Sequence, residues 1–463
     1  MTKVRSFKIK YFILALILQV ILLFLLHEEH ELREEWRITI YSVITLIFQL
    51  ISLKFILPPK SYLIPTFVIL SYLFNFGQIY VEAAGYEMPE LILSQSIWKN
   101  TGVFHAATLA LESIAGLFLG IIFYYTFIYK GIKLKEAIKK VVEPSITFVI
   151  ILLILGFVCD LAYTIHLSFT IGYGEVEDRD NFFYIVRLFS YLFPTAIAFL
   201  LTRQKIPLDT KTTILVFFLV YKFISIFSGY RGFPVINIIL ILYLYFKVCR
   251  SIKITLGKAA ILIGAGILGI SLLVAVRETR VSGVDVGLII DIITNSDNNV
   301  FLNILAENGV TLNPLCAVVD EKGGEGVGGW QLITSMMSIL PGVKTLFPGI
   351  DYYNLQLDTA LDMRHFGGSW ISDLCFDFGE DGLVPSSIIF GIVISACIGA
   401  FDSAIIRKRF IYVSFMFPII VDLFFCIRSS LSKMPRNIVW YFVIFYILWF
   451  AFSSRGKRFK FNE

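Results

Sequence analysis

Long apolar runs dominate this chain and restrict what it can fold into. A helix needs about 20 mostly apolar residues to cross the hydrocarbon core of a membrane. Runs that approach this length occur at residues 11–26, 38–53, 62–81, 104–129, 145–165, 182–201, 212–227, 233–246, 259–276, 383–401, 410–427 and 438–452. The first run is expected to be a retained helix rather than a cleaved signal peptide, because no small-residue cleavage site follows Leu26. The pattern predicts an all-α, polytopic integral membrane protein with about 12 transmembrane helices.

The composition excludes most soluble classes of protein. Hydrophobic residues make up 57% of the chain and charged residues 16%, whereas charged residues make up roughly a quarter of a soluble domain. Six cysteines in 463 residues are too few for a disulfide scaffold. Two of them, Cys316 and Cys375, can either pair in an oxidising compartment or remain free thiols.

The distribution of basic residues predicts the orientation in the membrane. Of the 40 Lys and Arg residues, 25 fall at the two termini and on one set of alternate connections, and 14 fall on the other set. Cytoplasmic segments carry the excess of Lys and Arg, so both termini are expected to be cytoplasmic. This topology explains the formal net charge of +5, and no nucleic-acid partner is expected.

One connection on the predicted outer side is much longer than the others. The chain divides into nine transmembrane helices over 1–276, a large extracytoplasmic loop over 277–382, and three further transmembrane helices over 383–463. The loop holds 15 Asp or Glu residues, five Lys or Arg residues, and 14 of the 32 glycines. Its amphipathic stretches 286–305 and 330–340 predict short helices, some along the membrane face. The glycine-rich segment 323–329 lacks the lysine of a phosphate-binding loop and is expected to be a flexible loop.

Cationic side chains gather at the outer ends of the predicted spans. They are Arg231 between the seventh and eighth spans, Arg277 and Arg280 after the ninth, Arg364 and His365 before the tenth, and Arg428, Lys433 and Arg436 between the last two. A guanidinium binds phosphate through two parallel hydrogen bonds and keeps its charge at physiological pH. Several guanidinium groups that converge would form a clamp for a diphosphate. The alternative is that each one contacts lipid headgroups or pairs with a loop carboxylate.

Four short motifs resemble those of the Wzy oligosaccharide-repeat polymerases, in particular the enterobacterial common antigen and O-antigen branch. The first is the Gly-x-Arg turn around Tyr230 and Arg231. The others are the proline-containing segment 339–349, the return of the loop to the membrane from His365 to Gly382, and the turn from Cys426 to Arg436. Many members of the family carry Glu where this chain has Asp373.

This resemblance implies a GT-C-like membrane fold and a glycosyltransferase that uses no cofactor. A metal-free reaction is expected from the residues themselves, because the sequence shows no metal-ligand spacing. The family transfers a growing glycan from undecaprenyl diphosphate onto the next lipid-linked repeat unit, for O-antigen, common antigen, capsule or exopolysaccharide. The expected catalytic residues are Arg231, Arg280, Arg428, His365 and Asp373. The expected substrate-binding residues are Arg277, Arg364, Arg436, Lys433 and Tyr230.

The resemblance also implies a location and partners. The chain is expected in the bacterial cytoplasmic (inner) membrane, with the active site facing the periplasm or the cell exterior. Its partners would be lipid-linked oligosaccharides as donor and acceptor, membrane lipid, a chain-length regulator and a flippase. Two alternatives remain open: an O-antigen ligase and a non-enzymatic flippase of lipid-linked oligosaccharides. A flippase is expected to carry charges deep in its spans, but few lie there (Asp160, Lys222 and, towards the outer end of its span, Arg187).

Overall fold

Helices account for all the regular structure that can be described. The computed structural model describes residues 2–28, 35–59, 61–88, 96–129, 145–169, 181–226, 232–249, 299–361 and 368–452. Within these residues every regular element is a helix, which confirms the predicted all-α fold. The chain forms two compact units.

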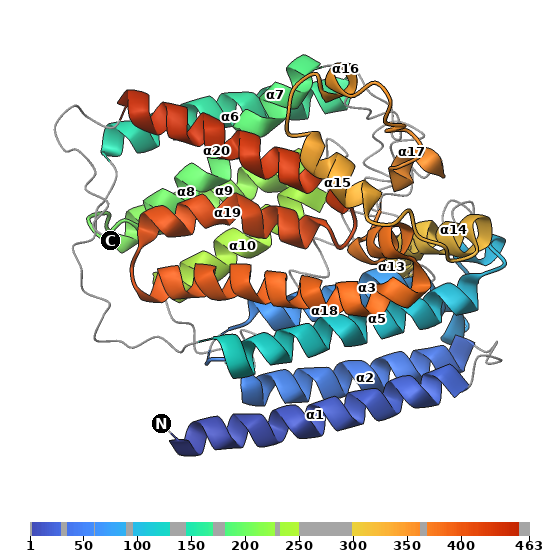
Figure 1. Cartoon of the computed structure of the whole chain (residues 1–463). Helices are drawn as coiled ribbons and strands as arrows, with labels where there is room; N and C mark the ends of the chain where they lie inside the picture. Colours follow the sequence, from blue (N-terminus) through green and yellow to red (C-terminus); the bar gives the residue numbers. More distant parts are fainter. Residues whose placement is uncertain are drawn as a thin grey trace. The chain divides into compact units, whose positions relative to one another are not determined.

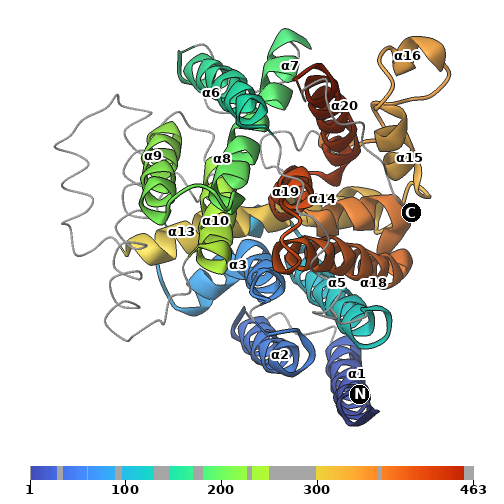
Figure 2. The same cartoon turned by 90° about the vertical axis from the view of Figure 1, so that its left-hand side faces the viewer.

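Unit 1 consists of Met1–Gly131, Ile254–Gly399 and Cys426–Lys433. In it the long helices α1, α2, α3, α5 and α18 lie side by side with their axes aligned (Figures 1 and 2). Its helices are α1 (Thr2–Glu28), α2 (Glu35–Ile56), α3 (Leu63–Ala83), η1 (Ile97–Lys99), α5 (Val103–Phe123), η2 (Tyr124–Ile128), α13 (Val300–Gly309), η4 (Val310–Leu312), α14 (Asn313–Lys322), α15 (Trp330–Met337), α16 (Val343–Leu346), α17 (Leu357–Ala360), most of α18 (Trp370–Ile406) and η5 (Leu431–Lys433).

Unit 2 consists of Ile132–Lys253, Ala400–Phe425 and Met434–Glu463. Besides the last residues of α18, it contains α6 (Ile146–Phe169), α7 (Asn181–Ser190), α8 (Leu192–Thr202), α9 (Leu208–Ile226), α10 (Gly232–Val248), α19 (Phe410–Phe425) and α20 (Met434–Phe452). Because few residues separate α9 from α10 in the sequence, the C-terminal end of α9 and the N-terminal end of α10 lie at the same end of this unit.

Most of the predicted membrane spans coincide with helices. Among the described residues, eight helical stretches are long and apolar enough to cross a membrane, and three shorter apolar helices accompany them. Eleven of the twelve predicted spans fall on described helices. The remaining one, the ninth span at 259–276, lies outside the described residues. A polytopic membrane protein is therefore confirmed, while the number of crossings and the GT-C-like class stay predictions.

One predicted span is broken into two helices. Residues 182–201 form α7 and α8, which are interrupted at Tyr191. Pro194 explains the interruption, because it has no N–H to donate to the carbonyl of Ser190, four residues earlier.

The polarity of α2 is the reverse of that of a helix in a water-soluble protein. Its polar residues Ser42, Thr45 and Gln49 are buried, whereas Ile44 and Ile47 are 51% and 52% exposed. Inside unit 1, the Gln49 side-chain amide donates to the Gln19 oxygen of α1 at 3.2 Å. A helix that turns apolar residues outward and pairs its polar residues with a neighbouring helix is adapted to a lipid environment.

Small residues allow α5 and α18 to approach closely. A Cβ atom at Gly120 would lie 2.1 Å from the carbonyl oxygen of Ile388, and one at Gly391 would lie 2.2 Å from that of Leu117. Further along the same contact, the hydroxyl groups of Ser113 and Ser387 form a 2.7 Å hydrogen bond. Small residues spaced four apart permit such backbone contact between membrane helices. This contact fixes the position of α18.

We expect Gly120→Ala to destabilise unit 1, because the added methyl group would force α5 and α18 apart. Overpacking of this kind costs about 1–3 kcal/mol. The measurement is the thermal unfolding midpoint of the purified protein in detergent. Gly349→Ala is the matched control, since a Cβ atom there meets no atom within 4 Å. Equal midpoints for the two variants would contradict the close contact.

Part of the predicted outer loop packs against a membrane helix. A Cβ atom at Gly77 of α3 would lie 2.0 Å from the Leu305 carbonyl oxygen, and one at Gly309 would lie 2.1 Å from the backbone nitrogen of Gln78. The stretch Phe301–Lys322, which includes most of α13, is itself apolar enough to cross a membrane. The placement of 277–382 outside the membrane therefore stays a prediction.

Candidate functional site

Arg428 carries a positive charge that has no carboxylate partner in the described part of the chain. It lies half-buried in the Cys426–Lys433 connection of unit 1. Its Nη1 donates to the side-chain oxygen of Asn308 in α13 at 3.1 Å, and its guanidinium carbon lies 5.9 Å from the centre of the Phe74 ring of α3. Among the described residues, this amide and this ring leave most of the five N–H donors of the guanidinium without a partner.

Asp373 holds the same connection from the start of α18. Its side chain is only 2% exposed. Oδ1 accepts hydrogen bonds from Gln331 Nε2 at 2.9 Å and from the Ser430 hydroxyl at 3.1 Å. Oδ2 accepts one from the backbone N–H of Leu431. Asp373 therefore binds the residues that follow Arg428 by two and three positions.

Two backbone contacts support this arrangement. The N–H of Trp370 donates to the Cys426 carbonyl at 2.9 Å. A Cβ atom at Gly368 would lie 3.0 Å from the backbone nitrogen of Ser430, so the backbone here packs closely against the connection. The start of α18 and the Cys426–Lys433 connection are thus fixed to each other along several residues.

A second carboxylate, Asp377, caps helix α15. Its two oxygens accept hydrogen bonds from the backbone N–H groups of Gln331 at 2.8 Å and Leu332 at 2.9 Å. The first N–H groups of a helix have no partner within it, and a carboxylate is favoured at this end of the helix dipole. Since Gly329 supplies no side-chain cap, the cap comes from α18.

The glycine-rich segment 323–329 is fixed against α18. The N–H of Val327 donates to Phe376 O at 2.9 Å, and the N–H of Glu380 donates to Gly324 O at 3.0 Å. At this point Gly379 has a φ of 71°, a conformation that favours glycine. The segment is therefore a loop, as the sequence predicts, and it is hydrogen-bonded to α18 beside the kink at Gly379.

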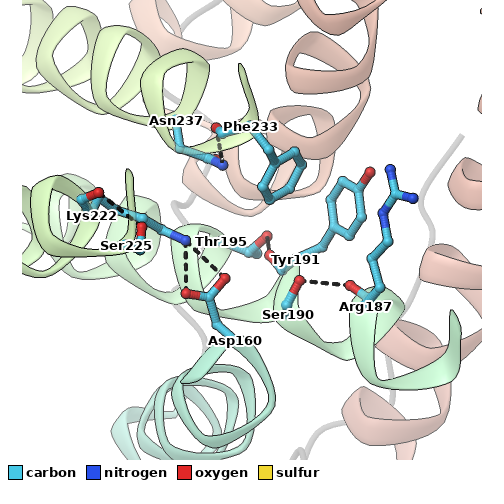
Figure 3. A network of polar contacts seen from close by, with 9 residues as sticks. All are labelled: Asp160, Arg187, Ser190, Tyr191, Thr195, Lys222, Ser225, Phe233 and Asn237. Atoms are coloured by element: carbon cyan, nitrogen blue, oxygen red, sulfur yellow. Dashed lines mark hydrogen bonds and ion pairs between the residues drawn. The ribbon is translucent and has the colours of Figure 1, made fainter. Parts of the chain in front are cut away.

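Unit 2 contains a buried ion pair (Figure 3). Lys222 of α9 donates to both carboxylate oxygens of Asp160 of α6 at 2.8 Å. The Lys222 ammonium also lies 5.6 Å from the ring centre of Phe193 and 5.9 Å from that of Phe233. Since both charges are enclosed and neutralised, this pair serves the packing of α6, α8, α9 and α10 rather than an incoming anion.

Other polar groups of unit 2 lie near the ends of its helices. Tyr191 donates to Asp422 Oδ1 at 2.7 Å, and Arg187 extends beside Tyr191 (Figure 3). The guanidinium carbon of Arg436 lies 3.9 Å from the centre of the Tyr184 ring, close enough for a cation–π contact.

The structure locates some of the predicted site residues. Arg428, Asp373 and the exposed Lys433 lie in unit 1, where Arg428 and Asp373 belong to one hydrogen-bonded arrangement; Arg436 lies in unit 2. Six predicted residues lie outside the described residues: Tyr230, Arg231, Arg277, Arg280, Arg364 and His365.

Gln331, Asp377 and Asn308 were not anticipated. Nothing in the sequence singles out Gln331 or Asp377, because Gln331 lies 46 positions from Asp377 and 42 positions from Asp373. Asn308 binds Arg428 across 120 positions. Such residues are identified from the hydrogen bonds of the folded chain.

Two further sequence predictions concern cysteine pairing and metal binding. Cys316 and Cys375 are both buried free thiols. Within the described ranges no group of three or more His, Cys, Asp or Glu side chains could hold a metal ion. The metal-free reaction stays a prediction.

Comparison with known families decides the identity. The sequence model of the family described as O-antigen polysaccharide polymerase Wzy matches residues 7–457. The chain belongs to this family. No curated protein and no solved structure matches the chain.

Membership of the Wzy family confirms the resemblance that the motifs indicate, although the common-antigen branch stays a prediction. The chain is a multi-pass membrane protein with a role as a polysaccharide polymerase. The geometry agrees with an anionic substrate for this Wzy family member, because Arg428 contacts Asn308 and no carboxylate among the described residues, and its connection is hydrogen-bonded to Asp373.

Proposed function

We propose that the chain transfers a growing glycan from its undecaprenyl diphosphate carrier onto the next lipid-linked repeat unit, at the outer leaflet of the bacterial cytoplasmic membrane. The observation that carries this proposal is Arg428, whose charge meets an amide and a ring but no carboxylate among the described residues. A diphosphate leaving group develops negative charge as its bond breaks, and a fixed guanidinium stabilises that charge without reorganisation.

In the proposed reaction a hydroxyl oxygen of the acceptor sugar attacks the anomeric carbon of the donor glycan. The bond from that carbon to the diphosphate oxygen breaks, and the electron pair leaves with undecaprenyl diphosphate. The hydroxyl proton passes to a general base, for which we propose His365, since an imidazole exchanges protons near neutral pH.

The remaining predicted residues have related roles in this proposal. Arg231 and Arg280 join Arg428 in stabilising the leaving diphosphate, because paired guanidinium groups bind diphosphate oxygens through parallel hydrogen bonds. The second set binds the carrier or the glycan and consists of Tyr230, Arg277, Arg364, Lys433 and Arg436. A chain-length regulator and a flippase are proposed partners.

The deciding test uses the purified protein in proteoliposomes with lipid-linked repeat units as the only substrate. A ladder of glycans with added repeat units is the expected product. Extension that requires added lipid A core would instead identify a ligase. Movement of the units across the bilayer without any extension would identify a flippase.

We expect EDTA to leave the ladder largely unchanged, because arginines supply the positive charge that a metal ion supplies in many other phosphate-handling enzymes. The measurement is the rate of ladder formation with and without chelator. If activity disappeared and returned only with an added divalent ion, the proposal that arginines bind the diphosphate would be wrong. A metal ion held by loop carboxylates would then be the better proposal.

The outward orientation predicts that a cysteine at position 349 is labelled from outside the cell. Gly349→Cys suits this test, because a Cβ atom there meets no neighbour within 4 Å. An impermeant thiol reagent should modify the variant in intact spheroplasts, above the background of the parent chain. Labelling only after permeabilisation would reverse the proposed topology.

A further inference from the structure

We propose that Gln331 and Asp373 (the anchor pair) are positioning residues that fix the Cys426–Lys433 connection, and with it Arg428, against the start of α18. The inference rests on the proposed function, which gives Arg428 its role at the leaving diphosphate. It assigns Asp373 a positioning role, whereas a catalytic one is expected from the sequence.

The hydrogen bonds of Asp373 favour positioning over proton transfer. Its two oxygens accept bonds from Gln331, Ser430 and Leu431, and its side chain is 2% exposed. A carboxylate offers about four acceptor positions, so most are already used inside the protein. A general base must come within hydrogen-bond distance of the hydroxyl group that it deprotonates, and this carboxylate is enclosed by its own partners.

Gln331 fixes which side chain of the anchor pair donates the hydrogen bond and which accepts it. Its Oε1 accepts the backbone N–H of Leu357 at 2.7 Å, and its Nε2 donates to Asp373 Oδ1 at 2.9 Å. A backbone N–H can only donate. If the side-chain amide of Gln331 rotated by 180°, its NH₂ group would face the N–H of Leu357 and the hydrogen bond between them would be lost. Gln331 is 3% exposed, so water cannot easily replace either contact.

Three segments distant in sequence therefore meet at the anchor pair. Gln331 lies in the first turn of α15, Asp373 lies in the first turn of α18, and the third partner is the connection that carries Arg428. The Ser430 hydroxyl also lies 2.8 Å from that of Ser432. A guanidinium reaches its bound anion in a defined geometry only if its backbone is held, and the anchor pair provides this restraint.

Because one side chain of the pair donates and the other accepts, the two roles can be exchanged between positions 331 and 373 by mutation. In Asp373→Asn alone, the new amide N–H₂ group faces either Gln331 Nε2 or the Leu431 N–H, so two donors meet. In the double variant Gln331→Glu with Asp373→Asn, the roles reverse. The new carboxylate at position 331 accepts from the new amide at position 373 and from Leu357, while the oxygen of that amide still accepts from Leu431. The Ser430 hydroxyl can then accept from the amide and donate to Ser432.

The readout is the rate of ladder formation by full-length protein in proteoliposomes with lipid-linked repeat units. We expect Asp373→Asn to slow the reaction roughly tenfold or more, since buried donors lose their acceptor. The double variant should return to within a few-fold of the parent rate. If Asp373 were the base, the double variant would stay inactive, because an asparagine cannot accept the proton. That outcome would overturn the proposal.

A second comparison tests whether the pair acts through Arg428. The Arg428→Lys background keeps a positive charge but loses the planar guanidinium group with its parallel N–H donors. In this background Asp373→Asn should lower the rate of ladder formation much less than it does in the parent chain. Fully additive losses in rate would overturn the proposal, since independent residues show no coupling.

A third readout does not need activity. In a chain carrying Ser429→Cys, Asp373→Asn should accelerate modification by a thiol reagent, and the added Gln331→Glu should slow it again. Unchanged rates would contradict the restraint. If the parent chain made no ladder while these rates followed expectation, the proposed function would fail and the restraint would stand.

Asp351→Asn is the matched control for the loss of a carboxylate. Asp351 also accepts hydrogen bonds from nearby N–H groups, those of Tyr353 and Asn354, but it is exposed. The hydrogen bonds from Asn354 lower the pKa of its carboxyl group, so it is ionised at neutral pH. The control should leave both the ladder and the labelling rate unchanged.

Discussion

Replacement of Arg428 by alanine should reduce glycan polymerisation by about 10²–10³, the loss that commonly follows removal of one donor to a developing anionic charge. The protein should remain in the membrane at a near-normal amount, because the guanidinium makes one hydrogen bond to an amide and no ion pair within the described residues. Lysine at this position should restore only part of the rate, since an ammonium group does not reproduce the two parallel hydrogen bonds of a planar guanidinium. The measurement is the ladder rate per amount of folded protein.

Arg409→Ala is the matched control. Arg409 also stacks on an aromatic ring, with its guanidinium carbon 5.8 Å from the centre of Tyr412, but it lies exposed in unit 2. Loss of this stacked arginine should leave the ladder unchanged. If Arg428→Lys were fully active, or if Arg428→Ala lost protein and activity together, Arg428 would be a structural or headgroup contact rather than a ligand of the diphosphate.

Replacement of Lys222 by methionine should strongly destabilise unit 2, because it leaves Asp160 as a buried charge without its partner. Removal of one member of a buried ion pair costs roughly 3–5 kcal/mol. Lys222 is 1% exposed and makes both of its short contacts to that carboxylate. The expected result is a large fall in the thermal unfolding midpoint and in the amount of protein in the membrane.

The double replacement Lys222→Met with Asp160→Leu should recover most of this loss, since well-packed apolar residues often substitute for a buried ion pair at little cost. Recovery of the ladder along with stability would assign the pair a structural role. A stable but inactive double variant would instead give the charges a part in the reaction.

The fold could be predicted to a large extent because lipid imposes a simple rule on sequence. Each membrane helix must be apolar over about 20 residues, so helices such as α2 and α20 fall where the runs 38–53 and 438–452 predict them. The break between α7 and α8 was missed, although Pro194 marks it. The packing of α13 on α3 was also missed, because the contact depends on Gly77 and Gly309, two glycines far apart in the chain.

The candidate site could be predicted only in part. Arg428 stands out in sequence because it directly follows an apolar span, and cationic side chains at membrane depth are costly and usually paired or functional. The environment of Asp373 has no comparable signal, since its partners are 42, 57 and 58 positions away. Sequence identifies a carboxylate but not whether its oxygens face a substrate or are occupied by neighbouring donors.

The close contact between Gly77 and Gly309 limits how members of this family can be recombined. A chimaera that imports the 299–361 segment from a relative to change the glycan it accepts also imports a new surface against α3. At Gly77 there is no space for a side chain, since a single Cβ atom would reach within 2.0 Å of the Leu305 carbonyl oxygen. Successful exchanges should therefore carry α3 together with that segment, and natural variation in the two should be inherited as one block.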